Sequence, residues 1–148
     1  MKLIIAFDPK GGIGYNGMLP WTNLQGDLPR FKELTTGKSI VMGRATWDSL
    51  PKKPLPNRTN YVFSHSPLEG AITLTDPVYL SSVSDAWVIG GAKVIETCWD
   101  YIDEIHVTRT FAEYTCDTFI DLVKLENEFM CWQKESFVDH SYEIWKRK

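Results

Sequence analysis

Two predicted strands that each end in glycine constrain the fold of this chain more than any other feature of its sequence. Residues 39–42 and 87–89 are largely apolar and show no alternation with polar residues, which is typical of strands covered on both faces in a parallel sheet. Gly43 follows the first segment and Gly90-Gly91 the second, and a candidate helix comes next in each case, at 44–50 and 92–99. We therefore expect a sheet in which parallel strands alternate with helices.

The remaining apolar segments fit the same architecture. Further strands are predicted at 3–7, 61–63, 71–74 and 105–108, and a further helix at 26–34. Near the C-terminus, 132–138 and 142–146 flank Asp139-His140-Ser141, which predicts a hairpin and an antiparallel edge. No repeat, low-complexity run or linker divides the sequence, so residues 1–148 are expected to form a single α/β domain.

The composition narrows the classes of partner and compartment. A chain of 148 residues, of which 43% are hydrophobic, has the size of one domain with an apolar core. The formal net charge of -3 gives no global reason to expect nucleic acid or an anionic membrane as a partner, so an anionic ligand needs a local basic patch. Cys98, Cys116 and Cys131 are odd in number and too far apart for a disulfide framework or a thiolate metal site. The N-terminal apolar run is too short for a signal sequence or a membrane span, so we expect a cytoplasmic protein. The spacing of the cysteines and histidines predicts no metal site.

The two strand ends marked by glycine also predict binding of a phosphorylated ligand. Backbone amides at a helix N-terminus bind phosphate, and glycine lets a ligand approach the backbone closely. Arg44, directly after Gly43, can form a charge-assisted fork to a phosphate. Each strand end alone is a weak signal, but two in one parallel sheet suggest a dinucleotide lying across the carboxyl edge. Neither contains the GxGxxG pattern, so an ordinary Rossmann dehydrogenase is not supported.

Asp27 is the candidate for acid–base chemistry. It falls in the first turn of the predicted helix, where acidic residues are favoured because they complement the helix dipole, and that structural explanation stays open. Alternatively, apolar side chains could form a wall around this carboxylate, namely Trp21, Leu28, Phe31 and Leu50. Because a carboxylate in such a pocket is costly without hydrogen bonds, the second explanation predicts a ligand that donates to it.

Two further segments are candidates for ligand binding. Arg58 follows a Pro-containing turn, and it either clamps a carboxylate or is a solvated surface residue. Residues 8–25 form a long segment that contains several Gly and Pro residues. A loop of that length inside a compact domain is usually functional, and we interpret it as a mobile cover over a site.

Taken in order, six segments of the chain resemble the dihydrofolate reductase family at the family's spacings. They extend over nearly the whole chain and comprise 13–21 (IGYNGMLPW), 27–32 (DLPRFK), 41–47 (VMGRATW), 54–58 (PLPNR), 88–91 (VIGG) and 117–119 (DTF). Any one could arise by chance, whereas all of them in register are highly specific. The resemblance implies a mixed, mostly parallel twisted sheet of about eight strands with a C-terminal antiparallel hairpin, flanked by about four helices. It also implies a monomer that reduces 7,8-dihydrofolate with NADPH.

The resemblance further assigns roles to residues of this sequence. Asp27 hydrogen-bonds the pterin and promotes its protonation, Thr108 supports Asp27, and Arg58 holds the α-carboxylate of the glutamate tail. The implied catalytic residues are Asp27, Leu19, Trp21 and Thr108. The implied substrate-binding residues are Ile4, Ala6, Asp27, Leu28, Phe31, Lys32, Leu50, Leu55, Arg58, Ile89 and Thr108. The implied cofactor-binding residues are Ala6, Ile13, Gly14, Leu19, Gly43, Arg44, Ala45, Thr46, Ser64, His65, Gly90, Gly91, Ala92, Lys93, Val94 and Ile95.

Some details of the site follow from these roles. Gly90-Gly91 is expected to be joined by a cis peptide, as is typical of the family. Arg44, Ser64 and His65 are expected to meet the 2′-phosphate of the cofactor. Asp27 is expected to be the only ionisable side chain deep enough to assist protonation. The three histidines are scattered without ligand spacing.

The sequence also departs from the family's pattern. Ala92 and Ile95 stand where a third small residue and a tyrosine are usual, and the loss of that hydroxyl puts cofactor placement in doubt. His65 replaces a small polar residue, which would make binding of the 2′-phosphate depend on pH. Residues 75–86 are too short for a full crossover helix and leave at most a turn or two. An extra residue near Thr22 lengthens the loop before Asp27.

Two rival functions stay open at this point. A riboflavin-pathway reductase resembles this fold and also uses NADPH on a pteridine-like substrate, but Asp27, Phe31 and Arg58 suit a pterin with a glutamate tail. A catalytically silent module that binds the nucleotide or assembles with a partner would bind NADPH without turnover. An absorbance assay with dihydrofolate separates these functions.

Overall fold

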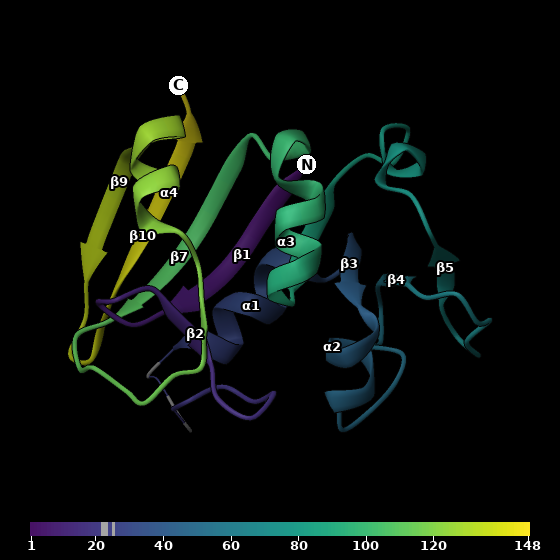
Figure 1. Ribbon diagram of the computed structural model, residues 1–148, viewed down its shortest axis with the longest axis horizontal. Coiled ribbons are helices and arrows are strands. Elements are labelled where there is room, and N and C mark those ends of the chain that lie inside the picture. Colours follow the sequence, from purple (N-terminus) through teal and green to yellow (C-terminus); the bar gives the residue numbers. More distant parts are fainter. Residues whose placement is uncertain (22–23, 25) are drawn as a thin grey trace.

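The computed structural model describes residues 1–21, 24 and 26–148, and an eight-stranded sheet forms its centre (Figure 1). The strand order is β5-β4-β3-β6-β1-β7-β10-β9. The sheet strands are β1 (Lys2–Phe7), β3 (Ser39–Gly43), β4 (Thr59–Phe63), β5 (Ile72–Leu74), β6 (Ala86–Gly90), β7 (Glu104–Thr110), β9 (Phe129–Ser136) and β10 (His140–Arg147). Neighbouring strands from β5 to β7 are parallel, whereas β10 is antiparallel to both β7 and β9.

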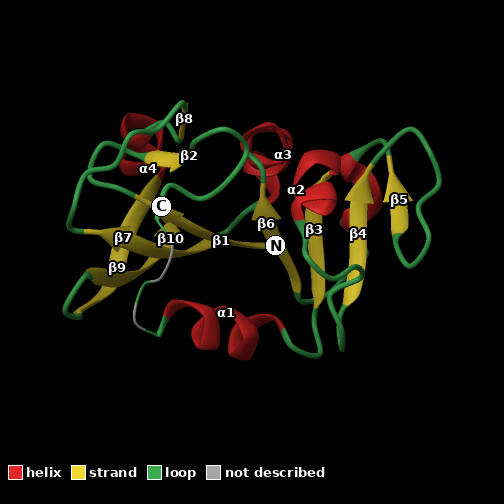
Figure 2. Ribbon diagram, turned by 90° about the horizontal axis from the view of Figure 1, so that it is seen from below, coloured by secondary structure: helices red, strands yellow, loops and turns green. Residues whose placement is uncertain are grey.

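Helices cover the two faces of this sheet (Figure 2). They are α1 (Asp27–Thr35), α2 (Arg44–Ser49), α3 (Ala92–Cys98) and α4 (Leu122–Glu128), with the 3-10 turns η1 (Pro77–Leu80) and η2 (Trp99–Tyr101). Helix α1 lies on one face, and α3 and α4 lie on the other. A small second sheet pairs β2 (Gly12–Gly14) with β8 (Thr118–Phe119). None of the helices in the described part of the chain has the length and hydrophobicity needed to cross a lipid bilayer.

Alternating side chains divide the core between the two faces. Leu3, Ile5 and Phe7 of β1 point to the face under α3 and α4, where they join a buried cluster with Leu125 of α4. Ile4 of the same strand packs on the opposite face, against a second cluster that includes Trp87. The central strands β3 and β6 are buried on both faces, which is why their sequences show no polar alternation.

The predicted strands and helices are confirmed to within a few residues, and so is the mixed sheet with its antiparallel C-terminal pair. The position of the last turn was wrong. His140 and Ser141 belong to β10, and the turn comprises 137–139, closed by a hydrogen bond from Phe137 N to His140 O of 2.8 Å. The polar sequence suggested a turn, but both side chains are buried.

The elements that the sequence did not locate are short. β2 and β8 have only three and two residues, too few for a readable period. Helix α4 begins at a side-chain cap, where Asp121 Oδ1 accepts from Lys124 N at 3.0 Å, and that Asp was a usable signal. Between β5 and β6 only the single 3-10 turn η1 is present, as the shortness of 75–86 predicted.

Candidate functional site

The carboxylate of Asp27 lies at the start of α1, over the carboxyl end of β7. Gly26 adopts a φ of 85°, a left-handed conformation that suits glycine, and Asp27 is the first residue of the helix. Thr108 of β7 is 5% exposed and donates from Oγ1 to Asp27 Oδ1 at 2.7 Å. The structure therefore joins the two residues to which the resemblance gives acid–base roles, and the carboxylate is half-buried.

Apolar side chains line the sheet beneath α1. Ile4 of β1 and Ile89 of β6 pack on one cluster together with Leu50 and Leu55. Trp21 is buried, with its ring centroid 5.4 Å from that of Tyr114. Among the described residues, Trp21 Nε1 has no hydrogen-bond partner. These positions give one side of the site an apolar surface.

The side chains predicted to surround Asp27 differ in their exposure. Phe31 is half-buried on α1, whereas Leu28 is 67% exposed. Lys32 and Leu19 are also exposed. The predicted lengthening near Thr22 lies outside the described residues, as do Thr22 itself, Asn23 and Gln25.

Arg58 lies at the other end of α1. Its Nη1 donates to Thr35 Oγ1 at 3.4 Å, its Nε donates to Pro56 O at 3.0 Å, and its guanidinium is 5.9 Å from the centroid of Phe31. Partial burial lowers the pKa of Arg58 from its ordinary value. The side chain is thus held beside α1 rather than freely solvated, although it is not fully enclosed.

The two strand ends marked by glycine meet, as predicted. β3 and β6 are neighbours, with Met42 opposite Gly90. The Gly90-Gly91 peptide bond is cis, which confirms that expectation. The contact is close, because a Cβ added at Gly43 would lie 3.0 Å from Val94 Cγ2 and 3.8 Å from Gly91 N.

Thr46 of α2 lies over the same glycines. A Cβ at Gly90 or Gly91 would come within 3.5 or 3.6 Å of Thr46 Oγ1. The starts of α2 and α3 therefore form one glycine-lined cradle, with the exposed side chains of Arg44, Ala45 and Lys93 beside it. Bare backbone and two cations fit the pyrophosphate of a dinucleotide.

Basic and polar side chains continue from this cradle toward β4. Arg44 donates from Nη1 to Ser64 Oγ at 3.4 Å and from Nε to Asp48 Oδ1 at 3.1 Å. Ser64 and His65 line a cavity of about 560 Å³ that is bounded on the far side by residues around η1. This is the place to which the resemblance assigns the 2′-phosphate and the adenosine.

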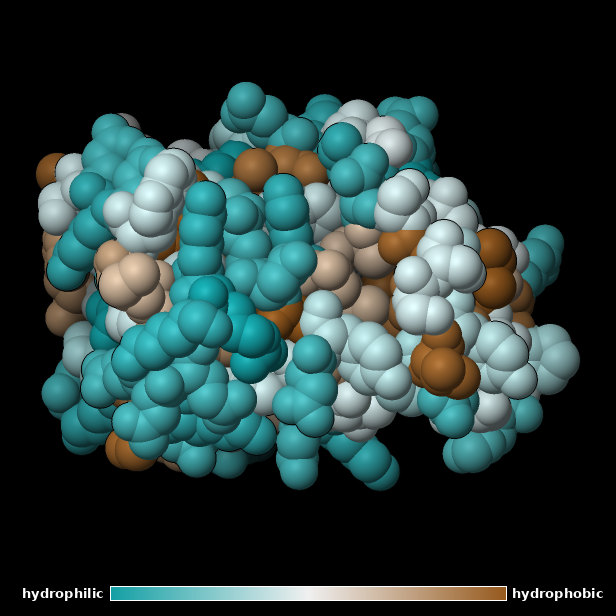
Figure 3. All heavy atoms as spheres, turned by 90° about the horizontal axis from the view of Figure 1, so that it is seen from above, coloured by the Kyte–Doolittle hydropathy of each residue, from teal (hydrophilic) through white to brown (hydrophobic). Residues whose placement is uncertain are grey.

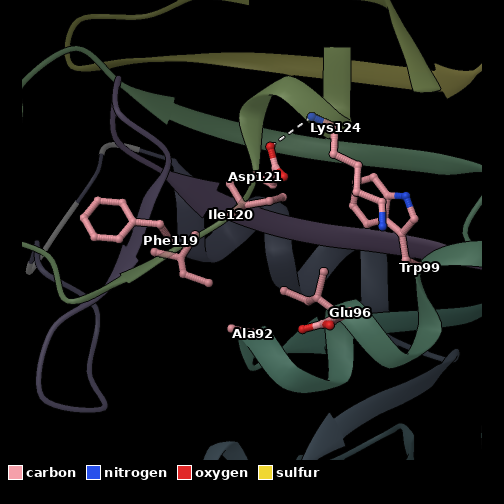
Figure 4. Close-up of a pocket in the computed structure, with 9 residues that line it drawn as sticks. Ala92, Glu96, Trp99, Phe119, Ile120, Asp121 and Lys124 are labelled. Carbon is pink, nitrogen blue, oxygen red and sulfur yellow. Dashed lines mark hydrogen bonds between the residues drawn. The ribbon is translucent and has the colours of Figure 1, made fainter. Parts of the chain in front are cut away.

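A second cavity, of about 330 Å³, separates α3 from β8 and α4 (Figure 4). Ala92 and Glu96 of α3 lie on one side, and Phe119 and Asp121 lie on the other. Ile13 and Ile95, both predicted to contact the cofactor, also line it. Gly14 lies at the end of β2, next to Thr118, so the nicotinamide side of the predicted site borders this cavity.

The first part of the predicted cover is attached to the body of the protein. Asp8 is buried and accepts from Gly12 N at 2.8 Å and from Tyr114 N at 3.0 Å. Asp117 Oδ2 accepts from Asn16 N at 3.0 Å, which lowers the pKa of Asp117. Hydrogen bonds thus hold the start of this segment against residues 114–118, while the mobility of the segment stays a prediction.

Two of the three histidines are buried, and the expectation that Asp27 alone is placed to assist protonation stays a prediction. His140 is 0% exposed, and His106 is also buried. Both lie on the sheet face under α1, next to Tyr142 and Arg30. Burial lowers the pKa of His106, although the hydrogen bond to Glu104 opposes this.

One signal in the sequence could have found this cluster. Arg30 follows Asp27 by three positions and therefore shares its helix face. His140 gave no signal of its own, because its neighbours suggested a turn.

Comparisons with known proteins show the family to which this chain belongs. The family model described as dihydrofolate reductase matches residues 1–145. "Dihydrofolate reductase type 8" of Escherichia coli is 34% identical over 163 residues, which cover 100% of this chain and 96% of that protein. Dihydrofolate reductase of Rattus norvegicus is 30% identical over 182 residues, covering 100% of this chain and 97% of the relative.

A solved structure gives the same result. Dihydrofolate reductase from Enterococcus faecalis, complexed with NADP(H) and RAB-propyl, superposes with a TM-score of 0.84 at 30% sequence identity. The superposition covers 99% of this chain and 95% of that one. The protein is therefore a member of the dihydrofolate reductase family.

Proposed function

We propose that this protein reduces 7,8-dihydrofolate to 5,6,7,8-tetrahydrofolate with NADPH. The observation that carries the proposal is the hydrogen bond from Thr108 to Asp27 at 2.7 Å, at the edge of an apolar surface. NADPH supplies the hydride when it is bound, so the protein has to provide placement, exclusion of water and one proton. The family relationship and the cradle at Gly43 and Gly91 support these separate roles of cofactor and protein.

Asp27 carries the proton chemistry in this proposal. With Thr108 donating to Oδ1, Asp27 Oδ2 is directed to the amino group and ring nitrogen of the pterin. A carboxylate that accepts from both favours the protonated ring, which is the form that takes up hydride most readily. Ile4, Ala6 and Ile89 form the apolar floor on which the ring lies.

The two ends of the ligands are held by cations. Arg58, supported by Thr35 and Phe31, clamps the α-carboxylate of the glutamate tail. Arg44 and Lys93 hold the phosphates, with His65 and Ser64 near the 2′-phosphate. Leu19, in the segment before α1, covers the nicotinamide side.

An absorbance assay tests the proposal. NADPH should be oxidised in the presence of dihydrofolate, and more slowly when NADH replaces it, because NADH lacks the 2′-phosphate that Ser64, His65 and Arg44 are proposed to meet. Binding of NADPH without turnover would favour a catalytically silent module. Turnover of a pteridine-like substrate without a glutamate tail, in place of dihydrofolate, would favour a riboflavin-pathway reductase.

We further propose that residues 1–148 form one domain, and that the protein acts as a cytoplasmic monomer. The single large sheet includes strands from both ends of the chain, β1 and β10, which supports one domain. Three free cysteines suit a reducing compartment.

A further inference from the structure

Arg30 of α1 lies between Thr108 and the turn that precedes β10. Its Nη1 is 3.4 Å from Thr108 Oγ1, and its Nη2 is 3.3 Å from His140 Nε2. Thr108 is the residue that donates to Asp27. Two consecutive hydrogen bonds therefore connect Arg30 to the carboxylate of the proposed active site.

The chemistry of arginine fixes the direction of each of these hydrogen bonds. A guanidinium can donate but not accept. Thr108 Oγ1 must therefore accept from Arg30, and the single hydroxyl hydrogen of Thr108 is left for Asp27 Oδ1. In the same way His140 Nε2 must accept, so the ring carries its proton on Nδ1 and donates it to Asp139 Oδ1, at 2.6 Å.

Arg30 itself is held in place by aromatic side chains. Its guanidinium carbon is 4.2 Å from the ring centroid of Tyr142 and 5.2 Å from that of Phe137, within the range of a cation–π interaction. Tyr142 lies directly opposite Thr108 in the pairing of β10 with β7. The strand register thus sets where the guanidinium lies relative to the threonine hydroxyl.

We propose that Arg30, anchored by His140 and Tyr142, is a positioning residue that directs the Thr108 hydroxyl toward Asp27. This inference rests on the proposed function, because it gives Arg30 a role through Asp27. Without Arg30 the Thr108 hydroxyl can rotate and lose its donation to Oδ1. The carboxylate then loses the orientation that leaves Oδ2 for the substrate.

A double-mutant cycle measures this coupling. Arg30→Met is expected to lower kcat/KM for dihydrofolate by about tenfold, the size of one hydrogen bond to a charged group. In Thr108→Val, which has no hydroxyl to direct, adding Arg30→Met should cost less than about twofold. In Thr108→Ser, which keeps the hydroxyl, adding Arg30→Met should again lower kcat/KM by about tenfold. Equal losses from Arg30→Met in the parent and in Thr108→Val would overturn the proposal.

Two controls separate this role from general stability and charge. Lys38→Met removes a positive charge from an exposed pair with Asp85, at 3.7 Å, and should leave kcat/KM within about twofold of the parent. Thermal unfolding of each variant shows whether the loss of activity follows the loss of structure. A variant whose kcat/KM falls only in proportion to its folded fraction counts against positioning.

The ligand-free parent protein provides a test that needs neither a variant nor turnover. ¹⁵N NMR of the His140 ring at neutral pH should show a protonated Nδ1 and an unprotonated Nε2. A ring protonated at Nε2 would overturn the proposal, since Arg30 could not then donate to it. If the parent fails to reduce dihydrofolate but His140 shows the expected tautomer, the proposed function fails and the hydrogen-bonded chain stands.

Discussion

Asp27 and Thr108 lie 81 positions apart in the sequence and meet through one hydrogen bond. The sheet provides Thr108 and helix α1 provides Asp27, so neither residue can be displaced without moving an element. The carboxylate is half-buried, which leaves it open to a ligand while its other side faces the protein. That asymmetry suits a group that must hold a ring and influence its protonation.

Replacing Asp27 by Asn tests the acid–base role. We expect Asp27→Asn to lower the rate at neutral pH by about 10²-fold, the usual effect of losing a proton-handling group. Asp100→Asn, at an exposed position of η2, is the matched control. Steady-state rates across acidic and neutral pH measure the effect, and a variant with the parent's profile would contradict it.

Arg58 should act on one ligand only. We expect Arg58→Leu to raise the Kd of dihydrofolate by roughly tenfold or more, since a charged hydrogen bond to a carboxylate is lost. NADPH binding should not change, because Arg58 contacts Thr35 and Phe31 rather than the glycine cradle. Fluorescence titrations give both dissociation constants, and a parallel loss of NADPH affinity would argue for a structural role.

The sequence predicted these residues better than their surroundings. Asp27 and Arg58 could be singled out because an acid at a helix start and an arginine after a turn are local patterns. Arg30 escaped notice because its importance comes from Thr108 and His140, which are distant in the sequence. The exposure of Leu28, 67%, was likewise not predicted, since helical spacing alone does not show how far the neighbouring elements cover a side chain.

At the level of elements, the contact between the ends of β3 and β6 decides whether a nucleotide can approach the backbone. Helices α2 and α3 begin there. The two helix starts are close together, because a Cβ added at Gly43 would lie 3.8 Å from Gly91 N. A larger residue at Gly43 would push α3 away from β3. The glycine is needed for space rather than conformation, because its φ of -83° suits any residue.

A pair of substitutions tests this explanation. Gly43→Ala places a Cβ 3.0 Å from Val94 Cγ2, and we expect NADPH affinity to fall by about tenfold, a typical cost of overpacking. Val94→Ala in the same chain should recover part of the loss by making room. If the double variant binds NADPH no better than Gly43→Ala, the glycine is required for direct approach of the ligand instead.

An ion pair between buried Glu143 of β10 and partly buried Arg109 of β7 links these two strands. Glu143 is 2% exposed and accepts from Ser141, Trp145 and Arg109. Burial alone would raise the pKa of Glu143, but these donors together lower it below its ordinary value. The unfolded chain therefore takes up this proton at a higher pH than the folded protein.

The stability due to Glu143 should accordingly be present above about pH 4.3, the ordinary glutamate value, and be lost as the pH falls through the lower native pKa. We expect Glu143→Gln to cost about 3 kcal/mol at pH 7, because it leaves Arg109 without its partner. The Glu143→Gln variant should also lose less stability than the parent between pH 7 and pH 3.5. Urea unfolding at pH 7 and pH 3.5 measures both effects, with the exposed Glu126→Gln as control. A variant as stable as the parent at pH 7 would contradict this role.

For the whole molecule, the surface supports the proposal of a monomer. The face in Figure 3 is mostly hydrophilic, and its hydrophobic residues gather in several separate groups. Exposed large apolar side chains are distributed over different elements, for example Leu28 on α1, Tyr79 on η1 and Trp132 on β9. Small apolar groups that are separated from one another by polar residues are normal on a monomer.

Light scattering after gel filtration tests the oligomeric state. We expect a mass near 17.0 kDa, that of one chain, at concentrations up to about 100 times those used in assays. Twice that mass would show that an apolar group on the surface is an interface, and would contradict the proposal.

The overall architecture was predicted from the sequence more completely than the roles of single residues. Continuous apolar segments such as β3 and β6 predicted strands that are covered on both faces in a parallel sheet, whereas the order of the strands was not predicted. The C-terminal turn did not follow, because His140 and Ser141 are polar residues that the network around Arg30 and Glu143 keeps inside. Buried polar groups break the binary pattern on which such predictions depend.

The place of β1 in the sheet bears on how the molecule is made. β1 precedes the other strands of the large sheet in the sequence but lies between β6 and β7, so its hydrogen-bonding partners, residues 86–90 and 104–110, are synthesised well after β1 itself. Until then neither edge of β1 has its native partner strand. Such non-local pairing makes folding slow, and we expect productive folding to begin only after β7 has emerged.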